Sequence, residues 1–120
     1  MFADPAVITV NAVAKNLVRI NQDKYSSEYL LRSATDEFRL NIRNTSYTDK
    51  KRGVAIDRHN VELIQTVFPV APATTSIVRK TYVVIENQVG DTLADPRELA
   101  KGLLAFLTTM QIDKLMNQES

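Results

Sequence analysis

The stretch EFRLNIRNTSY, residues 37–47, has the clearest two-residue periodicity in the chain. Three apolar side chains alternate there with two arginines and an asparagine, in the order Phe38, Arg39, Leu40, Asn41, Ile42 and Arg43. Because successive side chains of a strand point to opposite faces of a sheet, the stretch predicts a strand with one apolar face and one basic, polar face. The fold must cover the apolar face, while the polar face is free to contact something else.

Five further segments are rich in β-branched and aromatic residues and are typical of strands. They are residues 6–10, 13–20, 25–32, 54–68 and 77–89. Asn11 predicts a tight turn within an N-terminal hairpin. The sequence PVAPATTS at residues 69–76 contains two prolines and no charge, which predicts a stiff loop before the last strand.

The pattern changes from strand to helix after Gly90. Asp95 can cap a helix, Pro96 suits its first position, and Glu98 follows Asp95 at the spacing of a capping box. Apolar residues then recur at helical spacing, at Leu99, Leu103, Phe106 and Met110, followed by Ile112, Leu115 and Met116. Two C-terminal helices are therefore predicted.

These segments predict a single α+β domain that spans residues 1–120. A β-hairpin and an antiparallel meander sheet precede the two helices, over residues 1–21, 25–89 and 93–118. Two short helices are a thin cover for the apolar face of a sheet with several long strands, and monomers rarely expose a large apolar patch. We therefore expect a homodimer in which the helices of each chain pack on a shared sheet.

Charge and composition exclude several classes of function. The formal net charge is only +1, so a basic surface requires that charges segregate onto one face. The absence of cysteine excludes disulfides, thiolate zinc sites and cysteine nucleophiles. The N-terminal sequence MFADPAVITV has no basic region and no long apolar run, so we expect neither a signal peptide nor a membrane helix.

The sequence is also poor in catalytic motifs. Its three glycines are widely separated and cannot form a phosphate-binding loop. The single histidine, His59, shares a predicted strand face with Asp57, but a nucleophile would have to be supplied by folding alone. Asp91 and Asp95 could contact a hard cation, although such loop acids more often cap helices or face water. We expect no enzymatic activity.

The polar side of the sheet is the better candidate for a functional site. If Val61, Leu63, Val83 and Ile85 face the core, side chains from three strands meet on the opposite face. They are Arg39, Asn41, Arg43, Arg58, Asn60, Glu62, Lys80, Tyr82, Val84 and Glu86. Arginine, asparagine and an aromatic ring hold phosphates, read base edges and stack on single-stranded bases. An ordinary solvated face is the alternative, since antiparallel sheets often expose one side.

Three runs of sequence resemble the coat proteins of single-stranded RNA bacteriophages, the levivirus-like family. They are KYSSEYLL at 24–31, RHNVEL at 58–63 and VRKTYVVIENQVGD at 78–91. The likeness extends over nearly the whole chain, in the order of hairpin, meander and helices, and includes Arg-x-x-Tyr at Arg79 and Tyr82 on the last strand. The resemblance implies an interlocked homodimer in which helices of two subunits lie over one continuous antiparallel sheet.

The resemblance further implies a viral capsid. Dimers of the family assemble into a T=3 icosahedral shell, with the bare sheet face inside, where it binds single-stranded genomic RNA. In many members this face also binds one RNA hairpin, which represses replicase translation and marks the genome for packaging. The loop at residues 69–76 would lie at the symmetry axes. The protein would be made in the cytoplasm of a bacterial host and would reside in the virion.

Seven residues match RNA-facing positions of the family: Arg39, Asn41, Arg43, Arg58, Asn60, Lys80 and Tyr82. Tyr82 corresponds to the tyrosine that stacks on an unpaired loop base. Val84 departs from the pattern, because better-known members carry a polar, base-contacting residue there. This departure argues against hairpin recognition in the familiar form, whereas general RNA packaging does not depend on it.

Two alternatives stay open. Some relatives use metal ions between subunits, so a structural divalent cation at subunit interfaces is one; we expect no other cofactor, no membrane and no small-molecule substrate. The other is a dimeric, single-stranded nucleic-acid-binding regulatory domain that forms no shell. The uncharged loop at residues 69–76 favours the capsid, because a plain dimer has little use for it.

Overall fold

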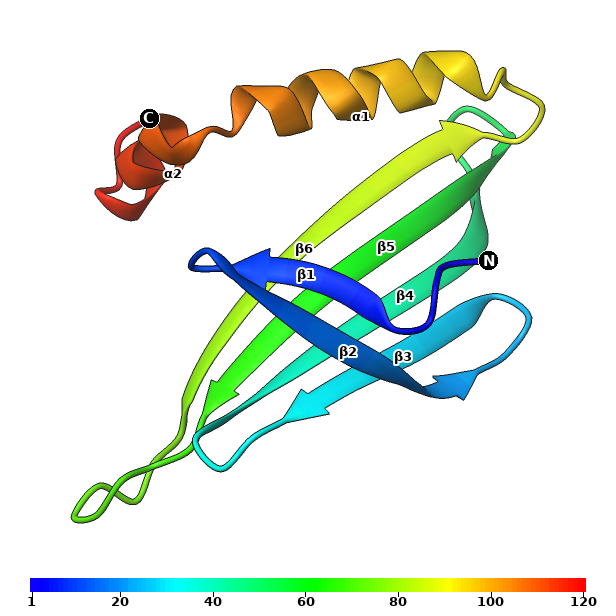
Figure 1. Ribbon diagram of the computed structural model, residues 1–120. Coiled ribbons are helices and arrows are strands. Elements are labelled where there is room, and N and C mark those ends of the chain that lie inside the picture. The colour runs from blue at the N-terminus through cyan, green and yellow to red at the C-terminus, as the bar shows by residue number, and fades with distance from the viewer.

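The computed structural model describes all 120 residues, as six strands followed by two helices (Figure 1). The strands are β1 (Ala6–Val10), β2 (Val13–Gln22), β3 (Ser26–Arg32), β4 (Asp36–Asp49), β5 (Val54–Val67) and β6 (Ile77–Gln88). The helices are α1 (Ala94–Phe106) and α2 (Thr109–Met116). Every predicted element is present within a few residues of its predicted position, and the α+β class is confirmed.

The strands form one antiparallel sheet in the order β1-β2-β3-β4-β5-β6. β4 and β5 pair from Asp36↔Val67 to Asp49↔Val54, without a break in either strand. A register shift between Arg19 and Asn21 marks an irregularity in β2, the kind of feature that bends a strand. The order leaves β6 as an edge strand with unpaired backbone groups on its outer side.

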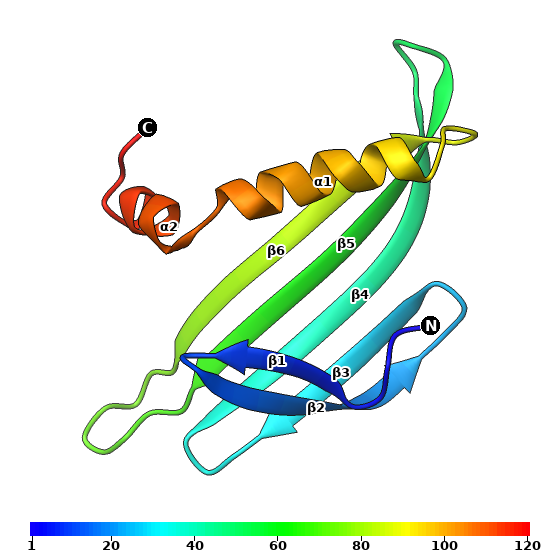
Figure 2. The ribbon, with the colours of Figure 1, turned by 45° about the horizontal axis from the view of Figure 1, so that its top comes forward.

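The β1–β2 hairpin crosses over one face of the sheet and forms the core with β3 and β4 (Figures 1 and 2). The buried residues of this core are Leu17, Tyr29, Phe38, Leu40 and Ile42. Ala6, Ile8 and Val10 of the hairpin pack against them. The periodicity of residues 37–47 is thus confirmed, because its apolar residues are the ones that are buried.

In the single chain the helices do not cover the apolar face of the sheet, and their expected packing in a homodimer stays a prediction. No residue of α1 or α2 is buried, and α1 contacts chiefly β6. The hairpin takes the covering role over β3 and β4 because its inward side chains alternate with outward ones, so that one side of it is apolar. The part of the sheet near β6 receives no such cover.

The hairpin turns follow the predicted chemistry. Asn11 and Ala12 form the two-residue turn between β1 and β2, with φ of 53° and 62°. The next three turns each use an aspartate: Asp23 accepts the backbone N–H groups of Tyr25 and Ser26, and Asp36 and Asp49 accept hydrogen bonds within their own turns. Ordered turns set the strand register, and the register sets which residues share a face.

The start of α1 differs from the prediction. The helix begins at Ala94, and Leu93 rather than Asp95 occupies the N-cap position. Thr92 supplies the polar contact instead: its Oγ1 donates to Asp95 Oδ2 at 2.8 Å and accepts the backbone N–H of Asp95 at 3.3 Å. These bonds lie ahead of the helix and do not form a capping box, because Asp95 accepts the hydroxyl of Thr92 and not its backbone N–H, and the N-cap residue Leu93 has no side-chain cap.

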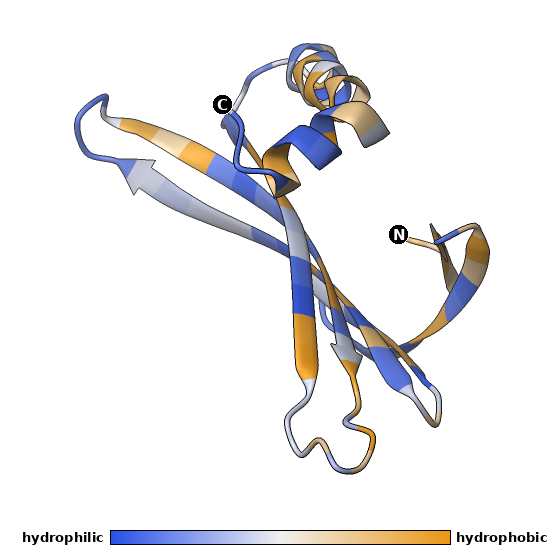
Figure 3. Cartoon of the chain, turned by 90° about the vertical axis from the view of Figure 1, so that its left-hand side faces the viewer, coloured by the Kyte–Doolittle hydropathy of each residue, from blue (hydrophilic) through white to orange (hydrophobic).

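Most of the chain is exposed. Only six of the 120 residues are buried, and the Cα radius of gyration is 17.3 Å, against about 13.6 Å for a compact domain of this length. Hydrophobic residues recur along the strands and the helices (Figure 3). Leu99, Leu103 and Phe106 are exposed apolar residues at helical spacing on α1, whereas the predicted fourth member of the stripe, Met110, lies on α2 because α1 ends at Phe106.

Candidate RNA interface

The face of the sheet opposite the hairpin carries all seven candidate RNA contacts. We call this surface the polar sheet face. Its defining residues are Glu28, Arg32, Glu37, Arg39, Asn41, Arg43, Tyr47, Arg58, Asn60, Glu62, Lys80, Tyr82, Val84 and Glu86. The strand register places them together, because residues directly paired in an antiparallel sheet point to the same side. The predicted facing of β6, with Val83 and Ile85 on the core side, is also confirmed.

Cross-strand pairing arranges the candidates in rows. Asn41, Glu62 and Tyr82 lie directly opposite one another on β4, β5 and β6. The next row consists of Arg43, Asn60 and Val84. Directly paired side chains are roughly 4.5–5.5 Å apart at Cβ, so each row is about the size of one nucleotide.

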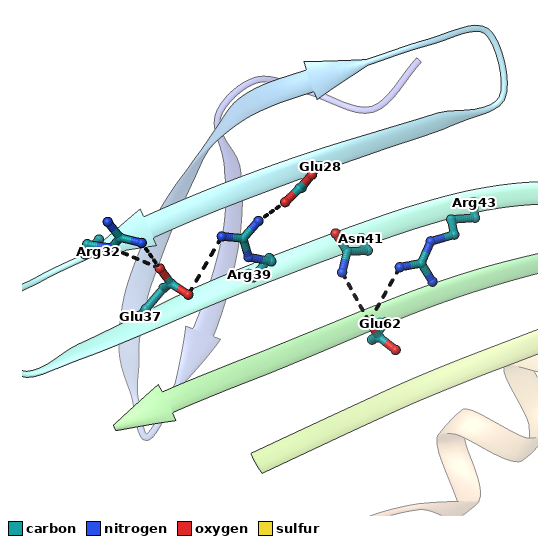
Figure 4. A network of polar contacts seen from close by, with 7 residues as sticks. All are labelled: Glu28, Arg32, Glu37, Arg39, Asn41, Arg43 and Glu62. Atoms are coloured by element: carbon teal, nitrogen blue, oxygen red, sulfur yellow. Dashed lines mark hydrogen bonds and ion pairs between the residues drawn. The ribbon is translucent and has the colours of Figure 1, made fainter. Parts of the chain in front are cut away.

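Acidic residues accompany the cations on this face (Figure 4). Arg39 pairs with Glu28, and its other terminal nitrogen lies 3.9 Å from Glu37. Arg32 Nε donates to Glu37 at 2.9 Å. The arginines therefore lie along the sheet surface instead of extending freely into water.

Glu62 connects three of the candidates. Asn41 Nδ2 donates to Glu62 Oε1 at 3.1 Å, and Arg43 lies at an ion-pair distance of 3.8 Å from Glu62 (Figure 4). Lys80 lies 3.9 Å from the same carboxylate. The Glu62 side chain is only 14% exposed, whereas those of Arg43 and Lys80 are about half exposed. A single sheltered carboxylate thus holds groups from both neighbouring strands.

A second polar group lies toward the other end of the face. Arg58 Nε is 3.8 Å from Glu86, and the hydroxyl of Tyr47 donates to Glu86 Oε2 at 3.0 Å. This hydrogen bond is the main reason that the pKa of Tyr47 is raised above its ordinary value, with the negative charge of Glu86 acting in the same direction.

Tyr82 and Asn60 have different surroundings. Tyr82 is 60% exposed, so its ring is open to a stacking partner. Asn60 is half-buried, and its Oδ1 atom has no hydrogen-bond partner. Val84 lies beside Asn60 in the same row, so the polar base contact of the familiar pattern is absent at that point.

The single histidine lies on the opposite face and forms no catalytic pair. His59 contacts the side-chain oxygens of Asn44 and Asn87, at 2.7 and 3.0 Å from its two ring nitrogens. Asp57 instead accepts a hydrogen bond from Ser46 Oγ at 3.0 Å. The histidine therefore links three neighbouring strands.

No group of three or more His, Cys, Asp or Glu side chains gathers in a way that could hold a metal ion within one chain. The predicted loop acids Asp91 and Asp95 are used locally, by the backbone N–H of Thr92 and by its hydroxyl respectively. None of the helices is long and apolar enough to span a membrane.

Sequence reasoning missed four members of this surface: Glu28, Arg32, Glu37 and Tyr47. Glu28 and Arg32 lie in the segment SSEYLLR, where apolar and polar residues do not alternate cleanly, so their face could not be assigned. The alternation of residues 37–47 does assign Glu37 and Tyr47 to the face of Arg39. The two-residue period alone therefore suffices to place Glu37 and Tyr47 on this face.

The sequence of the chain matches a model of phage coat proteins. The matching family is that of the phage phiCb5 coat protein, over residues 3–88. Because this range contains all six strands and more than half of the chain, the protein belongs to the phiCb5 coat protein family. No curated protein matches the chain significantly.

Membership in this family establishes the broad role. A phage coat protein is a structural component that assembles into the capsid of a virion. This role is consistent with the expectation of no enzymatic activity. The predicted likeness to phage coat proteins is therefore confirmed. The narrower likeness to levivirus-like, single-stranded RNA phages stays a prediction.

Proposed function

We propose that the protein is the major coat protein of a single-stranded RNA phage, whose dimers build an icosahedral shell and bind genomic RNA on the polar sheet face. The observation that carries the proposal is that the fold leaves two distinct surfaces exposed. One is the apolar surface of β6 and the helices, and the other is the polar sheet face. A coat protein has a use for both.

The extent of exposed surface supports a dimer. The chain has 9234 Å² of accessible surface, whereas a compact monomer of 13.5 kDa exposes roughly 6,500 Å². The excess is roughly 2,700 Å² per chain, or about 5,400 Å² for two copies, which is at the upper end of what obligate homodimers bury in total. A second copy would remove this surface from water.

The position of the excess surface suggests how the copies meet. An apolar groove runs between β6 and α1, lined by side chains that include Val83, Ile85, Leu99, Leu103 and Leu107. β6 is an edge strand, so its outer backbone groups can pair with another strand. Two copies related by a twofold axis would join their β6 strands into one continuous sheet, with each α1 over the partner.

The polar sheet face supports RNA as the other partner. It lies opposite the covering hairpin, and its row of Asn41, Glu62 and Tyr82 offers an amide, a carboxylate and an exposed ring. Cations flank this row on both sides. Phosphate contacts from arginine and lysine, together with base stacking on tyrosine, would bind single-stranded RNA with little sequence preference.

Finer features of the family are carried over as proposals. They are a T=3 shell, synthesis in the bacterial cytoplasm, a structural divalent cation between subunits, and repression of translation through one RNA hairpin. Val84 argues against the familiar form of the last of these, because valine cannot donate a hydrogen bond to a base. General packaging is the better supported role of this face.

Expression of the full chain in a bacterium, followed by electron microscopy and extraction of RNA, tests the proposal. We expect uniform hollow particles that contain host RNA. A soluble dimer that builds no particles even with added RNA would instead favour the regulatory RNA-binding domain.

Two variants locate the RNA site. Arg43→Ala should weaken binding to every RNA sequence and flatten the salt dependence by about 0.7 in the log–log slope, as loss of one phosphate contact does for single strands. Tyr82→Ala should weaken binding by about 1–3 kcal/mol without changing that slope. Unchanged binding in both variants would contradict the assignment of RNA to this face.

A further inference from the structure

The polar sheet face is almost neutral as folded. It contains five cations, Arg32, Arg39, Arg43, Arg58 and Lys80, and four carboxylates, Glu28, Glu37, Glu62 and Glu86. The remaining formal charge is +1. Every one of the five cations lies within 4.0 Å of one of these carboxylates. A face that attracts polyanions mainly by charge would not be built in this way.

Glu62 has the central position among these acids. It accepts a hydrogen bond from Asn41 and forms ion pairs with Arg43 and Lys80, which come from the two strands that flank its own. It also lies directly opposite Tyr82 in the strand register. A nucleotide stacked on Tyr82 would place its phosphate next to the cations that Glu62 already holds.

We propose that Glu62 is a resident anion of the RNA interface, which occupies the phosphate-binding side chains in the empty protein and which RNA phosphate displaces. Binding is then an exchange of one anion for another at Arg43 and Lys80, and Glu62 is a positioning residue that sets the affinity of the face. This inference rests on the proposed RNA-binding function and specifies its energetics.

Displacement is feasible because these ion pairs are weak and partly solvated. The distances of 3.8 and 3.9 Å exceed those of direct charge-assisted hydrogen bonds, and both cations are about half exposed. Exposed pairs of this kind contribute little to stability, so an incoming phosphate can replace the carboxylate. The side chains then move away from the sheet toward the RNA backbone.

The exchange predicts a result opposite to that expected if Glu62 were a direct RNA contact, whose loss would weaken binding. Removing the charge of Glu62 should tighten RNA binding, because Arg43 and Lys80 are no longer neutralised before RNA arrives. Glu62→Gln keeps an oxygen for the amide of Asn41 and so preserves the shape of the site. We expect roughly three- to tenfold tighter binding of a short oligouridine RNA at low salt, from the loss of two weak ion pairs.

The salt dependence distinguishes exchange from a general change of charge. In the natural chain, the displaced Glu62 carboxylate takes up a cation from solution and so offsets part of the counterion release. Glu62→Gln has no such uptake, so the log–log slope of binding against salt should become steeper. Glu119→Gln is the matched control, since Glu119 forms no ion pair and lies outside the face. It removes the same charge and should leave both affinity and slope close to those of the natural chain.

Variants that lack Arg43 and Lys80 distinguish a failure of this inference from a failure of the proposed RNA-binding function. Binding of the oligouridine is measured for the natural chain, for Glu62→Gln, for the double variant Arg43→Ala/Lys80→Ala, and for the triple variant. The inference predicts that the double variant weakens binding and that Glu62→Gln tightens it only when Arg43 and Lys80 are present. If the double variant binds like the natural chain, the RNA site itself is misplaced.

Other outcomes overturn only the exchange. If the double variant weakens binding but Glu62→Gln weakens it or leaves it unchanged, Glu62 is a structural residue or an RNA contact. Equal tightening by Glu119→Gln would show an effect of net charge alone. If Glu62→Gln does not fold, Glu86→Gln tests the same exchange at Arg58, and the absence of tightening there contradicts it.

Discussion

All five residues of the core cluster lie on β2, β3 and β4, whereas α1 and α2 contain no buried residue at all. The N-terminal part of the chain is closed by its own hairpin, and the C-terminal part presents an apolar groove and an edge strand to its surroundings. Both parts have amphipathic patterns, with the period of a strand in β4 and the period of a helix in α1. An amphipathic pattern therefore predicts that an apolar surface must be covered. It does not predict whether the same chain or a second molecule covers it.

The largest expected effect is on the C-terminal part. Leu103→Asp should abolish the dimer at micromolar concentration, because the new charge lies in the groove that a second copy would cover. Sedimentation velocity measures the change. Ala105→Asp, an exposed position on the other side of the same helix, is the control and should leave the dimer intact. A folded, stable monomer of the natural chain would contradict the need for a second copy.

The next effect concerns the N-terminal part, which should depend on its own contacts. Phe38 is 3% exposed in the core, so Phe38→Ala should lower the free energy of unfolding by about 3–5 kcal/mol. Chemical denaturation at fixed protein concentration measures it. Val18→Ala, at a position that is 54% exposed, should cost far less. Equal losses in the two variants would mean that the hairpin core is not a distinct source of stability.

The turn aspartates should make the sheet sensitive to acid. Hydrogen bonds lower the pKa values of Asp23, Asp36 and Asp49, chiefly from the Tyr25 backbone, the Ser33 side chain and the Arg52 side chain respectively. Because a folded pKa below the unfolded value favours the charged state, this stability is present above about pH 4 and is lost as the pH falls through the folded pKa values.

Asparagine variants test this acid sensitivity. The triple variant Asp23→Asn, Asp36→Asn, Asp49→Asn should lose less stability than the natural chain between about pH 5 and pH 3, measured by thermal unfolding. Asp91→Asn is a control on a loop outside the hairpin turns. If the stability of the natural chain and of the triple variant changed equally with pH, the three aspartates would not be the source of the acid sensitivity.

The smallest effect is expected at the first hairpin turn. Ala12 has φ of 62°, a left-handed conformation that glycine adopts more readily. Ala12→Gly should therefore stabilise the protein by up to about 1 kcal/mol. Ala14→Gly, in the strand that follows, should destabilise it instead. Destabilisation by both changes would show that the turn geometry does not limit the hairpin.

Strand positions and facing were predictable because each depends on local alternation. The opening stretch contains Phe38, Leu40 and Ile42 at spacing two, and their burial follows directly. The same reasoning brought Arg39, Arg58 and Lys80 to one face before the register was known. These are consequences of the strand period, which a single sequence displays.

Long-range choices were not predictable in the same way. That the hairpin covers β3 and β4 depends on where β2 bends, near Arg19, and no local pattern specifies such a bend. The start of α1 was misplaced because Asp95 satisfies the local rule for an N-cap, although the helix begins one residue earlier, at Ala94. The neutralisation of Arg39 by Glu28 required the register of β3 against β4, which depends on the whole sheet.

Hydrogen exchange of the β6 backbone in the purified protein tests the central claim most directly. In the single chain, the β6 amides that do not bond to β5 face outward and should exchange within seconds to minutes. If a second copy pairs with this edge, these outward amides should be protected as strongly as those that bond to β5, and Leu103→Asp should remove that protection. Fast exchange of the outward amides in the natural chain would contradict the account.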